Sequence, residues 1–547
     1  MRLVNIRKAY KGMTACILSA VFLSITGCAT SDTDNKADVE ILESEDIPGW
    51  QKHADDEVTF DWYVNYSWYT TPWGENVVSK KITEETGINI NFITPIGSAT
   101  EKFNAMIASD SLPDIITLGW WENQLDEMID KDMVYALNEL ADEYDPYFWK
   151  VADGDVVNWY TQNDGNIYCY PNSSFSPTDY EEHDNIGSNQ TFLVRKDIYE
   201  AIGSPDMTTP EGFKNAIRKA AEMFPEVDGE PLIPIGAHEF TDTGCVSFDQ
   251  NLQNFLAVPY EKNGIAYDRY TDGEYIRWLK AFRELGAEGY LKNDIFIDQR
   301  TQMEEKLEKG RYFCMIYQRT DMEAQQKKLY ANNPDMIYMA IDGPKNSKGD
   351  DHVLPGTGIN GWTVTLISKN CQRPDRAIEL FSYMMSEHGQ LILYKGVEGV
   401  TYDLIDGEVV LKPEVEEILL TNRKEYDELY GADSAYWMFQ DNVMQLKWRS
   451  ESQEPMAQLE EWTYKYTHYL GQYETLFEAN SEAGIADINI KKLWSETLPK
   501  LLLASTEEEF DRILNEFVKS RERMGYHSMM EESTKQITLA KEKLGLE

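Results

Sequence analysis

The segment VVSKKITEETGININFITP occupies residues 77–95 and combines two kinds of secondary structure. Its first half has the pattern of a helix, and Gly87 ends it because glycine readily adopts the left-handed backbone of a helix C-terminus. Residues 88–94 then alternate apolar and polar side chains, as in a strand with one buried face, and Pro95 closes the strand. The segment therefore predicts a helix that leads directly into a strand.

The same alternation continues on both sides of this segment. Residues 57–64 predict a strand before it, and residues 103–109 and 112–118 predict a short helix and a buried strand after it. Further strand and helix patterns follow at 190–194, 195–202, 209–223, 231–236, 273–285, 302–309, 311–317, 361–368 and 374–385. Because strands and helices alternate, we expect an α/β protein with mostly parallel sheets flanked by helices.

The C-terminal part of the chain has a different pattern. From about Pro413 onward helical periodicity dominates, most clearly over residues 456–470, 488–498 and 506–523. Thr506 opens the last of these with a residue suited to a capping box. These segments predict a helical C-terminal extension.

The N-terminus has the pattern of an export signal. Residues 1–27 carry a basic front, no acidic residue and an apolar run that is too short for a comfortable membrane span. The run ends in Ile25-Thr26-Gly27-Cys28, which resembles a bacterial lipobox, where cleavage precedes the cysteine and its thiol receives diacylglycerol. We therefore expect a lipoprotein signal peptide over residues 1–27, a lipidated Cys28 and a flexible acidic linker within residues 28–55. The alternatives are an ordinary signal peptide and a buried N-terminal helix.

The charge balance argues against several kinds of partner. With 51 Lys and Arg against 95 Asp and Glu, the net charge is −44, and without the four basic residues of the signal it is 47 − 95 = −48. A surface this acidic repels phosphate backbones, so we expect no nucleic-acid partner. The same acidity argues against an anionic ligand and favours a neutral one, with a cationic ligand as the alternative.

The sequence contains no pattern typical of an enzyme or a metal site. HExxH, Gly-x-Ser-x-Gly and Walker motifs are absent, and no two histidines stand at metal-ligand spacing. With 95 carboxylates, a glycosidase-like pair cannot be inferred from abundance. We therefore expect no enzymatic activity, no cofactor and no metal. Four cysteines of the exported chain allow three disulfide connectivities or remain buried free thiols, namely Cys169, Cys245, Cys314 and Cys371.

Several local patterns occur in an order that resembles a known family. They are a helix-turn-strand ending in Pro-Asp-Ile, a strand followed by Lys-Asp and a helix, a strand that follows a glycine, a helix pair and two further short segments. The residues are 103–116 (FNAMIASDSLPDII), 192–199 (FLVRKDIY), 310–317 (GRYFCMIY), 374–390, 397–402 (VEGVTY) and 498–500 (LPK). Together they resemble the long-chain branch of the family 1 extracellular solute-binding proteins, which are lipoprotein receptors of carbohydrate-type ABC importers.

The resemblance implies a two-lobed, periplasmic-binding-protein-like fold of type II with the ligand cleft between the lobes. Lobe 1 would comprise residues 56–171, lobe 2 residues 172–351, a return to lobe 1 residues 352–395, and lobe 2 with the helical C-terminal region residues 396–547. The implied partners are a carbohydrate, ABC permease subunits and the membrane, reached through the lipid anchor. We expect a monomer on the extracellular side of the cell membrane.

Aromatic side chains at strand ends are the first candidates for ligand contact. Ligands reach an α/β sheet at the carboxyl ends of its parallel strands, and sugars bind to flat aromatic rings. Trp68 and Trp73 follow the first predicted strand, and Trp120 and Trp121 follow the strand at 112–118. Tyr168 precedes the implied first crossover, where packing and ligand contact are equally good interpretations.

Polar candidates follow from the same strand-end argument and from the resemblance. Gln318 and Arg319 end the strand at 311–317, and Arg319 can donate paired hydrogen bonds to sugar hydroxyls or to a carboxylate. A surface salt bridge is the alternative for Arg319. Asn360 and Trp362 begin a later strand, and the resemblance makes Glu398 a candidate acceptor for sugar hydroxyls.

These patterns favour one function and leave two alternatives. The favoured function is an extracellular, membrane-anchored solute-binding protein that captures a carbohydrate, expected to be an oligosaccharide, and delivers it to an ABC transporter permease. The alternatives are a cell-surface glycoside-processing enzyme and a receptor for a peptide or another non-sugar solute.

Overall fold

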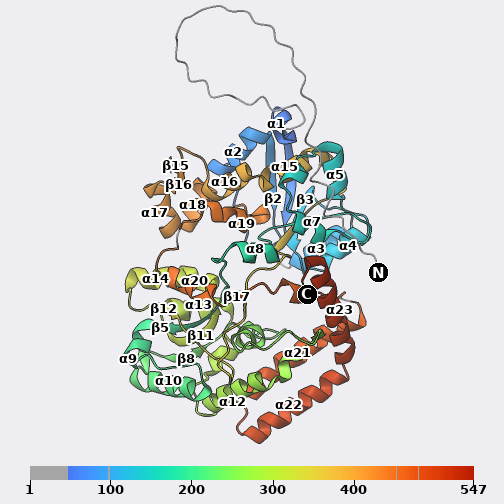
Figure 1. The fold of residues 1–547 in the computed structure, drawn as a ribbon. Coiled ribbons are helices and arrows are strands. Elements are labelled where there is room, and N and C mark those ends of the chain that lie inside the picture. The colour runs from blue at the N-terminus through green and yellow to red at the C-terminus, as the bar shows by residue number, and fades with distance from the viewer. Residues whose placement is uncertain (1–46, 97–98, 451, 479, 547) are drawn as a thin grey trace, which may run out of the picture. The chain divides into compact units, whose positions relative to one another are not determined.

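The computed structural model describes residues 47–546 apart from 97–98, 451 and 479. The predicted signal peptide, the lipidated Cys28 and most of the predicted linker lie outside the described residues. The described chain contains two large sheets and four two-stranded ones (Figure 1). Each large sheet has its own hydrophobic packing.

The first sheet has the strand order β2-β1-β3-β14-β4. Strand β1 (Val58–Val64) pairs in parallel with β2 (Ile88–Ile93) and with β3 (Ile115–Gly119). Strand β14 (Thr363–Ile367) runs antiparallel to both β3 and the short β4 (Tyr170–Pro171). The carboxyl ends of β1 and β3 therefore meet the start of β14 at one edge of the sheet.

The segment at residues 77–95 folds as its sequence predicts. Helix α2 (Val77–Thr86) is capped by the Asn76 side chain, which accepts a hydrogen bond from the Ser79 amide. Gly87 ends the helix with φ of 70°, a left-handed conformation that favours glycine. Strand β2 follows at once, and this direct connection packs the helix against the sheet that the strand joins.

The second sheet has the strand order β12-β5-β11-β8. Strand β11 (Tyr312–Gln318) runs antiparallel to β5 (Gln190–Arg195) and parallel to β8 (Ile233–Gly236), and β12 (Tyr338–Ala340) runs antiparallel to β5. The expectation of mostly parallel sheets is therefore wrong here. A strand buried on both faces, such as β5, has the same apolar pattern in either direction, so its sequence does not reveal the orientation of its neighbours.

Helices cover both faces of the second sheet. Cys314 and Ile316 of β11 face one apolar cluster, and Met315 and Tyr317 face the other. The larger cluster is covered by α10 (Pro210–Met223), α12 (Gly273–Ala287), α21 (Glu482–Leu502) and α22 (Glu507–Glu522). The smaller is covered by α13 (Arg300–Glu308), α14 (Glu323–Asn332) and α20 (Ala457–Tyr464).

The passage out of the first core lies later in the chain than residue 396. Hairpin β15 (Tyr402–Ile405) and β16 (Glu408–Leu411) leads into α17 (Pro413–Thr421) and α18 (Arg423–Leu429). Val415, Tyr426 and Trp437 pack into the first core, and the chain rejoins the second core at Met456. The predicted boundary is too early because an apolar helix stripe does not specify which of two cores it joins.

The predicted helix at 456–470 is also shorter than expected. Helix α20 ends at Tyr464, and β17 (Thr467–His468) pairs in parallel with β13 (Leu354–Pro355). Apart from α1 and α15, which are described below, the remaining α-helices are α3 (Ala99–Ala108), α4 (Gln124–Asp130), α5 (Leu137–Tyr144), α6 (Phe148–Val151), α7 (Gly154–Tyr160), α8 (Pro177–Glu182), α9 (Lys196–Ala201), α11 (Leu252–Phe255), α16 (Glu387–Lys395), α19 (Asn442–Gln445) and α23 (Tyr526–Leu544).

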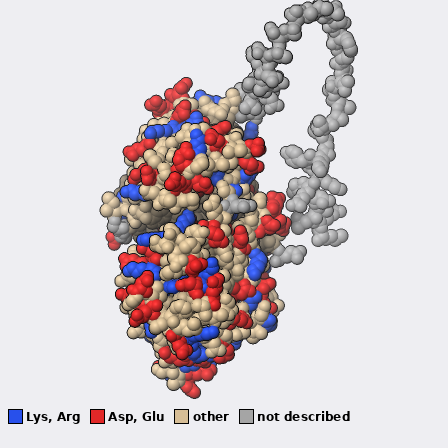
Figure 2. Space-filling view, turned by 90° about the vertical axis from the view of Figure 1, so that its left-hand side faces the viewer, with Lys and Arg blue, Asp and Glu red and all other residues tan. Residues whose placement is uncertain are grey.

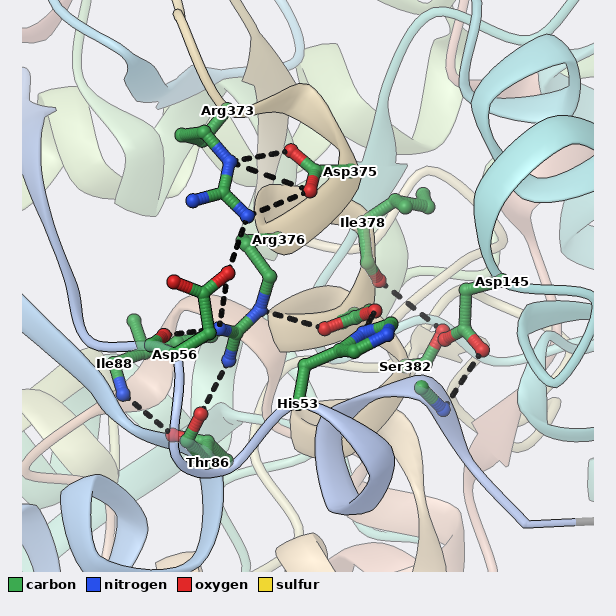
Figure 3. A network of polar contacts seen from close by, with 12 residues as sticks. His53, Asp56, Thr86, Ile88, Asp145, Arg373, Asp375, Arg376, Ile378 and Ser382 are labelled. Carbon is green, nitrogen blue, oxygen red and sulfur yellow. Dashed lines mark hydrogen bonds and ion pairs between the residues drawn. The ribbon is translucent and has the colours of Figure 1, made fainter.

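A buried ion pair attaches the start of the described chain to α15 (Pro374–Met385), as Figure 3 shows. Arg376 and Glu379 are 0% and 1% exposed, and Arg376 Nε lies 2.7 Å from Glu379 Oε2. The other nitrogens of Arg376 donate to the carbonyls of Asp56 and Thr86, and His53 Nδ1 lies 2.6 Å from Glu379 Oε1. Helix α1 (Gly49–Lys52) directly precedes His53 and lies within the predicted linker, and its Trp50 side chain is buried. The folded part therefore begins before residue 56.

The four cysteines of the described chain are buried and free. No helix among the described residues is long and apolar enough to cross a membrane. The described side chains also include no group of three His, Cys, Asp or Glu residues arranged to hold a metal ion.

Candidate binding cleft

A polar hollow of about 600 Å³ lies where passages of the chain cross between the two cores. Those passages are residues 172–189, 341–362 and 440–455, which connect the strands and core segments described above. We call this hollow the cleft. The second sheet supplies Gln190 and Gln318 to its wall, and the first core supplies Tyr394 and Asp433. Both cores therefore present side chains to one space.

Arg319 lines the cleft together with a second arginine that is distant in sequence. Arg319 Nη2 lies 3.1 Å from Glu460 Oε1, and Arg449 Nη2 donates to the same oxygen. The Ser452 hydroxyl donates to the other oxygen of Glu460, and Arg319 Nε donates to the Ser188 carbonyl at 2.9 Å. Burial opposes ionisation of Glu460, but the two guanidiniums more than offset this effect and lower the pKa of Glu460.

Asn360 contributes to the cleft through its contact with Glu474. Asn360 Nδ2 donates to Glu474 Oε2 at 2.9 Å, and Asn360 Oδ1 accepts from the indole of Trp159 at 2.8 Å. Glu474 lines the cleft, whereas Asn360 is buried behind it. The surrounding protein raises the pKa of Glu474 to about 7, because it limits hydration of the carboxylate.

An aromatic group lies at the carboxyl edge of the first sheet. Trp68 and Trp362 are stacked with centroids 6.1 Å apart and planes at 8°, and Trp437 packs 4.5 Å from Trp362. Trp68 is 56% exposed, so one indole remains available to a ligand. Trp362 follows Asn360, and Trp437 precedes the cleft residue Gln440 in the chain. We call Trp68, Trp362 and Trp437 the aromatic platform.

None of the predicted tryptophans lines the cleft itself, including Trp68 and Trp362 of the aromatic platform. Trp121 is 43% exposed and forms an edge contact with Trp120 after β3. Trp73 packs against Tyr436, and its indole donates to the Thr83 hydroxyl at 3.0 Å, which is a packing role. Neither the Trp120–Trp121 pair nor Trp73 lines the cleft.

Tyr168 and Glu398 are also placed away from the cleft. The Tyr168 hydroxyl donates to Asp164 at 2.7 Å in the turn next to it. Glu398 is exposed on the loop before β15, in the part of the chain that belongs to the first core. Its predicted position in the second lobe is therefore wrong, since the boundary at residue 396 on which that position depended is too early.

Two further hollows adjoin the cleft. One, of about 480 Å³, shares Asn185, Gln440 and Leu446 with it. The other, of about 650 Å³, shares Tyr394, Asp433 and Arg449 with it. The three hollows are therefore neighbours that share parts of their walls.

Most of the polar wall was not identified from the sequence. Asp433, Gln440, Arg449, Glu460 and Glu474 line the cleft but belong to a region that sequence patterns describe only as helical. Arg319 and Glu460 are 141 positions apart, so no local motif connects them. The short-range feature of the sequence near these residues is Gly471, which follows the predicted helix at 456–470 and lies close to Glu474 in the chain.

Comparisons with known proteins agree with this architecture. The chain is 20% identical over 341 residues to lipoprotein LipO of Bacillus subtilis (strain 168), a match that covers 60% of this chain and 64% of the relative. It is 21% identical over 331 residues to the polygalacturonan/rhamnogalacturonan-binding protein YtcQ of the same organism, covering 59% and 62%. The matches thus span less than two thirds of each relative.

A solved structure shows the same fold over nearly the whole chain. It is the Streptococcus pneumoniae ABC-transporter substrate binding protein FusA in complex with kestose, with a TM-score of 0.68 and 14% identity, covering 88% of this chain and 99% of that one. The two sheets and the cleft between them thus correspond to a two-lobed α/β solute-binding fold. The family model of bacterial extracellular solute-binding proteins matches residues 67–391, more than half of the chain. The protein is therefore a member of the bacterial extracellular solute-binding protein family.

Proposed function

We propose that the protein captures an oligosaccharide outside the cell and delivers it to the permease of an ABC transporter. The observation that carries this proposal is the cleft, whose polar side chains come from both cores, together with the aromatic platform at the carboxyl edge of the first sheet. Sugars need both features, because their hydroxyls take directional hydrogen bonds and their weakly apolar faces stack on indole rings.

The relatives support a carbohydrate ligand. YtcQ is described as binding polygalacturonan and rhamnogalacturonan, and the FusA structure contains kestose. The adjoining hollows favour a chain of sugars over a single sugar, because they offer space for further units next to the cleft.

The geometry supports a receptor over an enzyme. Three carboxylates line the cleft, and each already accepts a hydrogen bond from a described side chain. Glu460 accepts from two arginines, Asp433 from Arg423 at 2.9 Å and Glu474 from Asn360. A glycosidase needs one carboxyl group as acid and another as base or nucleophile at the scissile bond. Paired carboxylates suit binding better than such proton transfer.

Capture would proceed by closure of the two lobes over the ligand. A sugar that contacts Gln318 on the second sheet and Gln440 near the first core binds more tightly to the closed form, and this difference in affinity drives the shift. The lipobox-like sequence at Cys28 supports a membrane tether on the extracellular side. A monomer suffices for this mechanism, because both walls of the cleft come from one chain.

Calorimetric titration with a panel of oligosaccharides tests the proposal. We expect binding of at least one oligosaccharide without release of shorter sugars, and a more compact particle by small-angle X-ray scattering when the ligand is present. Product formation would establish an enzyme instead. Binding of peptides with no binding across the glycan panel would establish a receptor for a non-sugar solute.

A further inference from the structure

Two guanidinium groups share one carboxylate oxygen in the wall of the cleft. Arg319 and Arg449 both donate to Glu460 Oε1, and within the described residues both salt bridges of these arginines go to Glu460. The group therefore combines two positive charges with one negative charge. The other two carboxylates of the cleft bond to different side chains, since Asp433 accepts from Arg423 and Glu474 accepts from Asn360.

Burial makes this imbalance costly for the cluster. The side chains of Arg319 and Glu460 are 13% and 6% exposed, so water compensates their charges only in part. Burial lowers the pKa of Arg319, and repulsion from Arg449 adds to this effect against the attraction of Glu460. A second anion beside the two arginines would balance the charges.

Donors remain available on the cleft side. Arg449 is 29% exposed, and no hydrogen bond among the described residues uses its Nε or Nη1. Arg319 uses Nε and Nη2, which leaves Nη1. Arg449 lines both the cleft and the adjoining hollow, so its side chain borders a space that a sugar chain can occupy.

We propose that Arg319 and Arg449 form a carboxylate-binding subsite and that the ligand is an oligosaccharide containing uronic acid. This inference rests on the proposed function and adds the chemical class of the sugar. A planar uronate carboxylate matches the fork of a guanidinium, and such charge-assisted bonds are stronger than bonds to neutral hydroxyls.

The net charge of the protein does not oppose this ligand. Acidic and basic side chains are mixed over the face shown in Figure 2, rather than forming a uniformly negative surface. At physiological ionic strength, charges more than about 8 Å away are largely screened, so the nearest groups decide the affinity. The net charge of −44, from which no anionic ligand was expected, does not describe these nearest groups.

Titration with matched sugars separates the carboxylate from the rest of the ligand. The probes are oligogalacturonides of three to six units, their methyl esters, which lack the charge, and oligomers of alginate as a second source of uronate. We expect the full-length wild-type protein to bind at least one acidic series about 10- to 100-fold more tightly than the methyl-esterified form.

Variants assign this preference to the two arginines. Arg449→Gln should lose most of the preference while binding of the ester changes less than about 3-fold, and Arg449→Lys should retain part of it. Arg512→Gln is the matched control, because Arg512 is 58% exposed on α22 and pairs with Glu516 outside the cleft. It removes the same charge and should change neither affinity. Thermal unfolding of each variant confirms that it is folded.

The outcomes distinguish the carboxylate subsite from the proposed function on which it rests. Equal affinity for acid and ester in the wild type, or equal loss of both in Arg449→Gln, would overturn the carboxylate subsite. Binding of neutral oligosaccharides alone would overturn the subsite and leave the proposed function intact. Binding of no oligosaccharide would overturn the proposed function and the subsite together.

Discussion

Two arginine–glutamate clusters of this protein contain similar side chains but differ in how many of their hydrogen-bond donors have a partner. In the first core, Arg376 is fully buried, and its nitrogens donate to Glu379 and two backbone carbonyls (Figure 3). In the cleft, Arg319 and Arg449 both donate to the same oxygen of Glu460, and other donors of the two guanidiniums have no partner among the described residues. A complete cluster stabilises the fold, whereas an incomplete cluster beside a groove provides a binding site for a ligand of the missing charge.

Glu379→Gln should produce the largest change in stability. The variant leaves Arg376 buried with no full counter-charge at hydrogen-bonding distance, and breaking such a pair costs about 3–5 kcal/mol of unfolding free energy. Urea unfolding followed by circular dichroism measures it. Asp375→Asn is the control, because the Asp375 and Arg373 side chains are 32% and 38% exposed and their pair should contribute less than about 1 kcal/mol. Similar losses in both variants would show that burial of the pair has no special weight.

His352 is a buried titratable side chain that needs no counter-charge, because it stays neutral in the folded protein. It is fully buried with Nδ1 2.7 Å from the Phe255 carbonyl, and burial lowers its pKa to about 4. Between pH 6.5 and 4 the unfolded chain binds a proton that the folded protein does not, so the free energy of unfolding falls as the pH falls. The loss should reach up to about 3 kcal/mol.

Comparison with a variant isolates this contribution from that of other titrating groups. His352→Gln keeps a donor for the Phe255 carbonyl and should lose less stability than the wild type over the same pH range. His527→Gln, at a side chain that is 79% exposed, should follow the wild type. Parallel pH profiles for the wild type and His352→Gln would contradict the assignment.

Glu460→Gln should cost less than Glu379→Gln, about 1–3 kcal/mol. It removes the shared carboxylate, but Arg449 is 29% exposed and can be hydrated from the cleft, unlike Arg376. Thermal unfolding measures the loss, and an acidic oligosaccharide that binds the subsite should raise the melting temperature of the variant by supplying the missing anion. A loss as large as that of Glu379→Gln would show that the cleft cluster contributes as much to folding stability as the buried pair of Arg376 and Glu379.

The contrast between the clusters also shows what sequence patterns could and could not predict. Helix α2 and its Gly87 end were predicted because capping and periodicity are local. Arg319 was predicted to face the cleft because it follows a strand end. Its partners Arg449 and Glu460 were missed, since their contact with Arg319 depends on how the third passage of the chain crosses between the cores. For the same reason, Val415 and Trp437 were assigned to the wrong core, and the resemblance misplaced Glu398.

Glu474 should give the smallest effect and tests whether the cleft is hydrated. Its pKa of about 7 means that the folded protein holds a proton that the unfolded chain releases between pH 4.5 and 7. Stability should therefore decrease as the pH rises through this range and change little above it. The decrease should stay below about 1 kcal/mol, because the Glu474 side chain is exposed to the cleft, and water there screens part of the effect that the surrounding protein has on its carboxylate.

Glu474→Gln should remove this decrease while keeping the hydrogen bond between side chains 360 and 474, as measured by urea unfolding from pH 4.5 to 8. If the variant differs from the wild type by several kcal/mol, the carboxylate is enclosed as fully as Glu379, and the distinction between a dry core cluster and a hydrated cleft fails. If the difference is small and a bound oligosaccharide enlarges it, the ligand displaces water from Glu474, which places the sugar against Asn360 and the start of the aromatic platform.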